Sequence, residues 1–186
     1  MPRLRPLLFA GLALLAGACS SGGGEDCERM PGVRPGVCIT APEDRGQAPT
    51  EPGPQLGADG EELAVTDFAG TPLVVNFWGS WCGPCRVEQP ELNDVAETFA
   101  GEVAFLGVNV QDPVANARAY QAEFDVPYES IHDPRGSFAA RFGGIGPNVM
   151  PSTLLLDEEG RVAVRLFGST SDTELTVLLD RLLAEG

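Results

Sequence analysis

The alternation of short apolar runs with helical segments constrains the fold of this chain more than any other feature. Two runs, TPLVVNFW at 71–78 and VAFLGVNV at 103–110, contain almost only apolar residues. Such runs are typical of strands that are covered on both faces of a sheet. The segment 152–168 predicts two further strands joined by an acidic, Gly-containing turn. This order predicts an α/β fold in which helices flank both faces of a sheet.

Caps and periodicity predict the helices between these strands. One helix is predicted from about Gly83 to Phe99. A second begins at Pro113, with Asp112 as its N-cap. Ser171 and Glu174 predict a capping box at the start of the last helix. The shorter predicted elements are strands near 62–65 and 128–132 and a helix near 137–142.

The first residues, 1–18, predict an export signal that does not belong to the fold. Two arginines precede the apolar run 7–18, which is too short to span a bilayer. Small residues then lead to Cys19 and a Ser/Gly spacer, as in a bacterial lipobox, although Ala16 stands where Leu is commonest. We predict a lipid on Cys19 that anchors the protein outside a bacterial membrane. The alternative is a cut near Ala18, which would give a secreted or periplasmic protein.

The segment 19–54 predicts a flexible tether, because it is rich in Gly, Pro, Ser and acidic residues. Its reach would be on the order of 30 Å. Within it, Cys27 and Cys38 predict a local structural disulfide rather than a second redox site. The chain has five cysteines, and lipidation of Cys19 would leave two pairs that can oxidise outside the cytosol. The folded domain is predicted at 55–186.

The net charge of the chain argues against nucleic acid as a partner. The chain carries a formal charge of −15 at pH 7. Such a surface repels nucleic acid and anionic lipid. No nucleic-acid partner is therefore expected.

Cys82 and Cys85 lie where a predicted buried strand meets a predicted helix. A cysteine at a helix N-terminus faces free backbone N–H groups and the positive end of the helix dipole, which stabilise its thiolate. Pro84 favours the first helical turn, and Gly83 leaves Cys82 open to a large partner. The arrangement predicts a redox disulfide, with Cys82 as the exposed nucleophile and Cys85 as the sheltered resolving thiol.

Glu88 falls on the predicted core-facing stripe of the same helix, together with Cys85, Leu92 and Val95. A carboxylate in such a position is costly unless it has a task. Spacing alone favours an edge position from which Glu88 reaches solvent. A functional buried acid remains the alternative.

No metal or cofactor is predicted. Cys27 and Cys38 are spaced too widely for a four-cysteine zinc site. The single histidine, His132, is expected to be a hydrogen-bonded residue at the end of a strand. The stretch 143–148 lacks the spacing of a nucleotide-binding loop and is interpreted as an ordinary loop.

The segment VVNFWGSWCGPCRVEQP at 74–90 resembles the active-site segment of the thioredoxin superfamily, specifically its TlpA/ResA-like extracytoplasmic branch. The resemblance covers the chain from about Leu56 to the C-terminus. It implies the thioredoxin fold, with a mixed central β-sheet flanked by helices on both faces. It also implies that Cys82 attacks a client and that Cys85 resolves the mixed disulfide.

The same resemblance implies roles for further residues. Glu88 matches an acid that this branch places three residues after the second cysteine, whereas Asn76 stands where cytosolic thioredoxins have a buried acid. MPST at 150–153 implies a cis Met150–Pro151 peptide beside the disulfide. The Gly-rich loop 143–149 departs from the family pattern and leaves the shape of the substrate groove open. The implied client-binding residues are Trp81, Gly83, Pro84, Met150 and Pro151.

The predicted function is that of a membrane-tethered, extracytoplasmic thiol–disulfide oxidoreductase. Its expected partners are the thiols and disulfides of exported proteins and a membrane thiol–disulfide electron carrier. The Gly-Pro pair between the cysteines resembles that of reducing thioredoxins, and the branch commonly reduces apocytochrome c. We therefore predict a reductant.

Three alternatives stay open. The first is a disulfide-forming oxidase of the same fold. The second is a peroxiredoxin-like peroxidase, which would have Thr and Pro before a lone cysteine, whereas Ser80 and Trp81 precede Cys82. The third is a copper-delivery module, which would have three residues between its cysteines and a histidine near the cis-proline loop.

Overall fold

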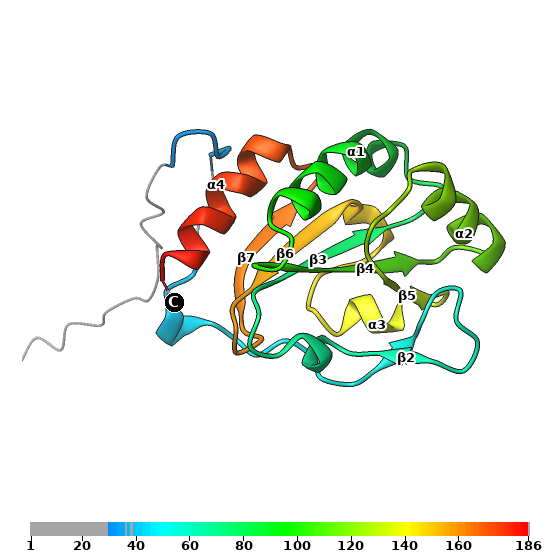
Figure 1. The fold of residues 1–186 in the computed structure, drawn as a ribbon. Coiled ribbons are helices and arrows are strands. Elements are labelled where there is room, and N and C mark those ends of the chain that lie inside the picture. The colour runs from blue at the N-terminus through cyan, green and yellow to red at the C-terminus, as the bar shows by residue number, and fades with distance from the viewer. Residues whose placement is uncertain (1–29, 36, 38, 186) are drawn as a thin grey trace, which may run out of the picture.

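A five-stranded sheet lies at the centre of the computed structural model, which describes residues 30–35, 37 and 39–185. Its strand order is β5-β4-β3-β6-β7, where β3, β4 and β5 are parallel and β6 and β7 run antiparallel to their neighbours. The strands are β3 (Leu73–Trp78), β4 (Ala104–Val110), β5 (Ser130–Asp133), β6 (Ser152–Leu156) and β7 (Val162–Phe167). The mixed sheet confirms the predicted fold class (Figure 1).

Helices cover both faces of this sheet. Helices α1 (Gly83–Thr98) and α4 (Asp172–Leu183) lie over one face, and α3 (Ser137–Ala140) lies over the other (Figure 1). Helix α2 (Val114–Glu123) packs through Tyr120 on Trp78, whose ring centroid is 4.4 Å away. The remaining elements are β1 (Gly53–Pro54), β2 (Glu62–Leu63) and the 3-10 helices at Pro42–Asp44, Val65–Phe68 and Pro147–Val149.

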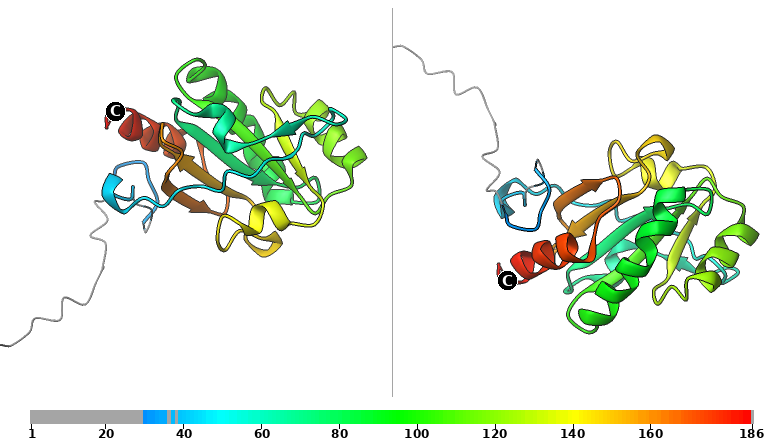
Figure 2. Two further views of the ribbon diagram at one scale, coloured as in Figure 1. Left: turned by 90° about the horizontal axis from the view of Figure 1, so that it is seen from below. Right: turned by 90° about the horizontal axis from the view of Figure 1, so that it is seen from above.

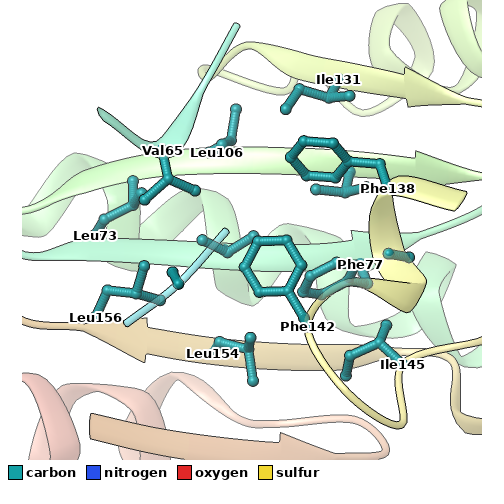
Figure 3. Packing of buried hydrophobic residues seen from close by; sticks show 14 of the residues in the cluster. Val65, Leu73, Phe77, Leu106, Ile131, Phe138, Phe142, Ile145, Leu154 and Leu156 are labelled. Carbon is teal, nitrogen blue, oxygen red and sulfur yellow. The ribbon is translucent and has the colours of Figure 1, made fainter. Parts of the chain in front are cut away.

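The α3 face carries an aromatic core. Phe142 meets Phe77 edge-on with ring centroids 5.2 Å apart, and Phe138 lies 5.6 Å from Phe142. Figure 3 shows these rings above leucines of the central strands. Each such side chain contributes roughly 1.5–3 kcal/mol when it is fully buried. This core packs against β3, whose C-terminal end leads to the site described next.

The segment before β3 lies against the domain, although the sequence predicts a flexible tether up to residue 54. The Thr40 N–H donates to the Ala163 carbonyl of edge strand β7 at 2.8 Å. The Leu56 N–H donates to the Ser130 carbonyl of the opposite edge strand, β5, also at 2.8 Å. The segment thus crosses the α3 face from one sheet edge to the other (Figure 1, Figure 2). These two contacts use backbone atoms, which leave no hydrophobic pattern in the sequence.

Arg45 fastens this segment to the C-terminal part of the domain. It is 9% exposed, and its guanidinium pairs with Asp157 at 3.2 Å and with Glu185. The predicted signal peptide, the lipid on Cys19 and the Cys27–Cys38 disulfide fall on residues outside those described, so they stay predictions. Within the described residues, no helix is both long and apolar enough to cross a membrane.

Two predicted helix caps differ in the structure. Pro113, not Asp112, is the N-cap of α2, and the Asp112 side chain bonds elsewhere. The capping box of α4 is only half formed, because Ser171 Oγ accepts the Glu174 N–H at 3.1 Å while the Glu174 carboxylate turns to other partners. In both cases a tertiary contact replaces the local one. The predicted strand at 62–65 also shortens to two residues, since a 3-10 helix begins at Val65.

Candidate active site

Cys82 and Cys85 form a disulfide at the junction of β3 and α1. Cys82 is the N-cap of α1, and the Cys85 N–H points at Cys82 Sγ from 3.2 Å. This donor and the dipole of α1 would stabilise a thiolate on Cys82. Both cysteines are buried in this oxidised form, with Cys82 3% and Cys85 1% exposed. The prediction that Cys82 is exposed is therefore wrong for the oxidised form, because the Cys82 side chain packs among Trp78, Tyr120 and Cys85. The adjacent open space lies at Gly83, where an added Cβ would meet no atom within 4 Å.

The predicted client-binding residues surround this disulfide. Trp81 is 47% exposed, and its indole N–H donates to the Val110 carbonyl at 3.1 Å. Gly83 and Pro84 are exposed beside it. The Met150–Pro151 peptide is cis, as the resemblance implies, and Met150 packs against the cluster that contains both cysteines. Tertiary structure therefore brings the loop before β6 to the CxxC segment.

Glu88 is buried one turn after Cys85, on the same face of α1. It is 2% exposed, so the solvent-edge interpretation of its position is wrong. Its carboxylate accepts hydrogen bonds from Asn76 Nδ2 at 3.1 Å and from the Thr170 N–H at 3.0 Å. Burial raises the pKa of Glu88 to about 7, although these two hydrogen bonds oppose the shift. Glu88 can therefore exchange a proton near neutral pH.

Tyr120 and Asn76 were not predicted as site residues, and both donate hydrogen bonds to α1. Tyr120 donates its hydroxyl to the Cys85 carbonyl at 2.9 Å, and burial raises the pKa of Tyr120, which keeps it a donor. Asn76 also donates to Thr153 Oγ1 at 3.1 Å, so it links Glu88 to β6. No spacing rule pairs these residues with α1, because Asn76 lies on β3, Tyr120 on α2 and Thr153 on β6.

Asp112 is a further site residue, and the sequence predicted a different role for it. Its carboxylate accepts the Ser80 N–H at 2.6 Å, the Ser80 hydroxyl at 2.8 Å and Asn109 Nδ2 at 3.0 Å. Asp112 is 3% exposed. It therefore braces the loop that leads into Cys82. His132 contacts the Asp112 carbonyl through Nε2 at 2.9 Å, which agrees with the expected hydrogen-bonded histidine.

The Asp112→Asn variant is expected to loosen this loop, because an amide supplies one acceptor where the carboxylate supplies two. We expect a loss of about 1–3 kcal/mol in the free energy of unfolding and slower disulfide exchange. Denaturant unfolding and exchange kinetics measure the two effects. The exposed Asp94→Asn change on α1 is the control, and equal stability of the two variants would contradict the bracing role.

Metal ligands do not gather in the described part of the chain. No group of three or more His, Cys, Asp or Glu side chains there is placed to hold an ion. The groups present at the site are a cysteine pair, a buried carboxyl group and their hydrogen-bond donors.

Comparisons with known proteins agree with this chemistry. Residues 46–165 match the model of the AhpC/TSA family. The thiol:disulfide interchange protein HelX of Rhodobacter capsulatus is 31% identical over 184 residues, which are 97% of each chain. The thiol-disulfide oxidoreductase ResA of Geobacillus thermodenitrificans is 29% identical, over 67% of this chain and 70% of that protein.

Solved structures give the same result. A secreted thiol-disulfide isomerase from Corynebacterium glutamicum superimposes with a TM-score of 0.73 and 30% identity, covering 87% of this chain and 98% of its own. The chain carries a CxxC disulfide on the same fold. It therefore belongs to the thioredoxin-like AhpC/TSA family and is a thiol–disulfide oxidoreductase of the HelX/ResA type.

Proposed function

We propose that the protein reduces disulfides in exported proteins from an extracytoplasmic, membrane-tethered position, for example in cytochrome c maturation. The observation that carries the proposal is the buried carboxyl of Glu88, one helical turn from Cys85. The export signal and lipobox predicted around Cys19 support the location. The relative from Corynebacterium glutamicum is itself described as secreted.

The exchange proceeds in two steps that conserve electrons. The Cys82 thiolate attacks a client disulfide, forms a Cys82–client bond and releases one client thiolate. The Cys85 sulfur then attacks Cys82 Sγ, releases the second client thiolate and closes the Cys82–Cys85 disulfide. Two electrons pass to the client, and a membrane thiol–disulfide carrier would return two electrons to the protein.

Glu88 acts in the second step of this proposal. The Cys85 thiol must lose its proton before its sulfur attacks, and the enclosed site excludes bulk water as the acceptor. Ionised Glu88 lies on the same buried face of α1 and takes that proton as a general base. Its pKa of about 7 suits the role, because the carboxyl both accepts and returns a proton near neutral pH.

The client would lie along the exposed rim of the site. Trp81 offers an aromatic surface next to Cys82. Met150 follows the 3-10 helix at Pro147–Val149 in an extended conformation, which suits pairing of its backbone with an extended client segment. The proposed client is therefore an unfolded or extended chain with an accessible disulfide.

The reduction potential of the Cys82–Cys85 couple tests the direction of transfer. For a reductant we expect a value near that of thioredoxin, about −270 mV, rather than the roughly −120 mV of a strongly oxidising disulfide donor. Equilibration of the purified protein with defined ratios of reduced and oxidised dithiothreitol or glutathione measures it. A potential in the oxidising range would overturn the reductant role in favour of the oxidase alternative.

A further inference from the structure

An N-terminal loop, described at residues 30–35, 37 and 39, lies on α4 outside the segment matched by the family model. Its apolar side chains join the core cluster between α4, α1 and the sheet; they are Met30, Val33, Val37 and Ile39. A Cβ added at Gly32 would lie 3.4 Å from Val177 and 3.5 Å from Thr173 of α4. The loop is therefore in van der Waals contact with α4 (Figure 1, Figure 2).

Arg34 points from this loop toward the turn that precedes α4. Its backbone N–H donates to Glu174 Oε1 at 2.9 Å, and its Nε lies 3.5 Å from the same oxygen. Its Nη1 donates to the Ser169 carbonyl at 2.7 Å. Its Nη2 is buried and has no hydrogen-bond partner among the described residues. The guanidinium is thus held beside residues 169–170 with part of its donor capacity unused.

Thr170 connects this guanidinium site to Glu88. The Thr170 hydroxyl donates to Glu174 Oε2 at 3.0 Å, and the Thr170 N–H donates to Glu88 Oε2 at 3.0 Å. One residue therefore bridges two buried carboxylates. Glu174 is 5% and Glu88 2% exposed. When both groups are ionised their charges repel each other, and a nearby cation offsets this repulsion.

We propose that Arg34 is a positioning residue for the redox reaction: its charge, held by Glu174 and Ser169, favours the ionised form of Glu88 and joins the N-terminal loop to the active site. The proposal rests on the role of Glu88 given under the proposed function. Arg34 lies outside residues 46–165, the segment that the family model matches.

The charges around Glu88 agree with this role. Burial raises the pKa of Glu88, and the hydrogen bonds from Thr170 and Asn76 and the charge of Arg34 lower it. Glu91, on α1 itself, raises it. Nearby ionisable groups on the packed elements include Glu174 on α4, Tyr120 on α2 and Tyr128 after α2. Arg86, the nearest cation on α1 in the sequence, pairs with Glu123 of α2 instead. Among the described residues, Arg34 is the cation that lowers the pKa of Glu88.

A titration of Glu88 by carboxyl ¹³C NMR tests the proposal in the oxidised full-length protein. In the Arg34→Met variant we expect the midpoint to rise by roughly 0.5–1 pH unit, less than for a direct ion pair, because Thr170 and Glu174 intervene. Arg34→Lys keeps the charge and should restore most of the original midpoint. Glu91→Gln should move it in the opposite direction.

Arg181→Met is the matched control, because it removes the same charge from the exposed side of α4. An unchanged midpoint in Arg34→Met, or an equal rise in Arg181→Met, would overturn the proposal. The second readout is the pH profile of mixed-disulfide resolution. Arg34→Met should shift this profile when Glu88 is present, by as much as it shifts the midpoint. The same substitution should leave the profile unchanged in a Glu88→Gln variant. If Glu88→Gln alone leaves that profile unchanged, the proposed role of Glu88 in the reaction is wrong. The NMR midpoint in Arg34→Met would still test whether Arg34 favours the ionised form of Glu88.

Discussion

Cys85→Ser is expected to accumulate covalent complexes with client proteins, and Cys82→Ser is expected to form none. Without Cys85 the first attack still occurs, but no neighbouring sulfur displaces the client from Cys82. Without Cys82 the remaining cysteine is 1% exposed and lies one turn inside α1, where a large client does not reach it. Both variants should lose all catalytic turnover, the largest effect expected of any single substitution.

Non-reducing electrophoresis followed by mass spectrometry measures this trapping. A Cys82→Ser, Cys85→Ser double variant gives the background from other thiols of the chain. Because both cysteines are buried in the oxidised form, the experiment starts from protein reduced with dithiothreitol. Equal trapping by the two single variants would reverse or abolish the assigned division of labour.

The second large effect is expected from Glu88→Gln, as a change in the pH dependence of stability. Folding raises the pKa of Glu88 from about 4.5 to about 7, so the folded protein binds this proton more tightly than the unfolded chain does. The stabilisation is complete below pH 4.5 and is lost as the pH rises to 7. The loss is about 3 kcal/mol, taking about 1.4 kcal/mol for each pH unit.

Denaturant unfolding of the oxidised protein between pH 4.5 and 8 measures this loss. Wild type should lose free energy of unfolding across the interval, and Glu88→Gln should lack that component. Glu97→Gln removes an exposed carboxylate from the same helix and is the control. Parallel curves for wild type and Glu88→Gln would show that folding does not raise the pKa of Glu88.

The same variant tests the proposed proton transfer. In wild type the resolution of a mixed disulfide should accelerate through pH 7, as Glu88 becomes able to accept the Cys85 proton. In Glu88→Gln this rise should disappear and leave the slower rate set by the thiol alone. Stopped-flow measurement of resolution across this pH range gives both profiles.

Much of the fold was predictable, because hydrophobic periodicity reports directly on burial. The runs that became β3 and β4 are buried along nearly their whole length, and the predicted helix at 83–99 differs from α1 by one residue. The segment 40–54 was not predictable in this way. Its Pro- and Gly-rich composition is typical of a tether. Its contact with the domain depends on backbone hydrogen bonds to β7 and on the Arg45 ion pairs.

In the candidate site, too, the local features were predictable and those that depend on packing were not. The cysteine pair and its place at a helix N-terminus are local features, so spacing alone identified them. Spacing did not determine the burial of Glu88, because an edge and a core position on a helix differ only in what packs against them. Asp112 shows the limit most clearly: local rules make it an N-cap, whereas its carboxylate binds Ser80, which lies 32 residues away in the sequence.

By itself, the sequence determined the α/β class, the redox cysteine pair and the order in which the elements follow each other. These depend on residue type and on spacings within one helix or strand, which the chain carries locally. Only the tertiary structure decided the protonation range of Glu88, the hydrogen bonds of Asp112 and the contacts of Arg34 with Ser169 and Glu174. Each of these depends on burial and on partners from distant segments, and the energy of a buried charge is set by its surroundings rather than by its neighbours in the sequence.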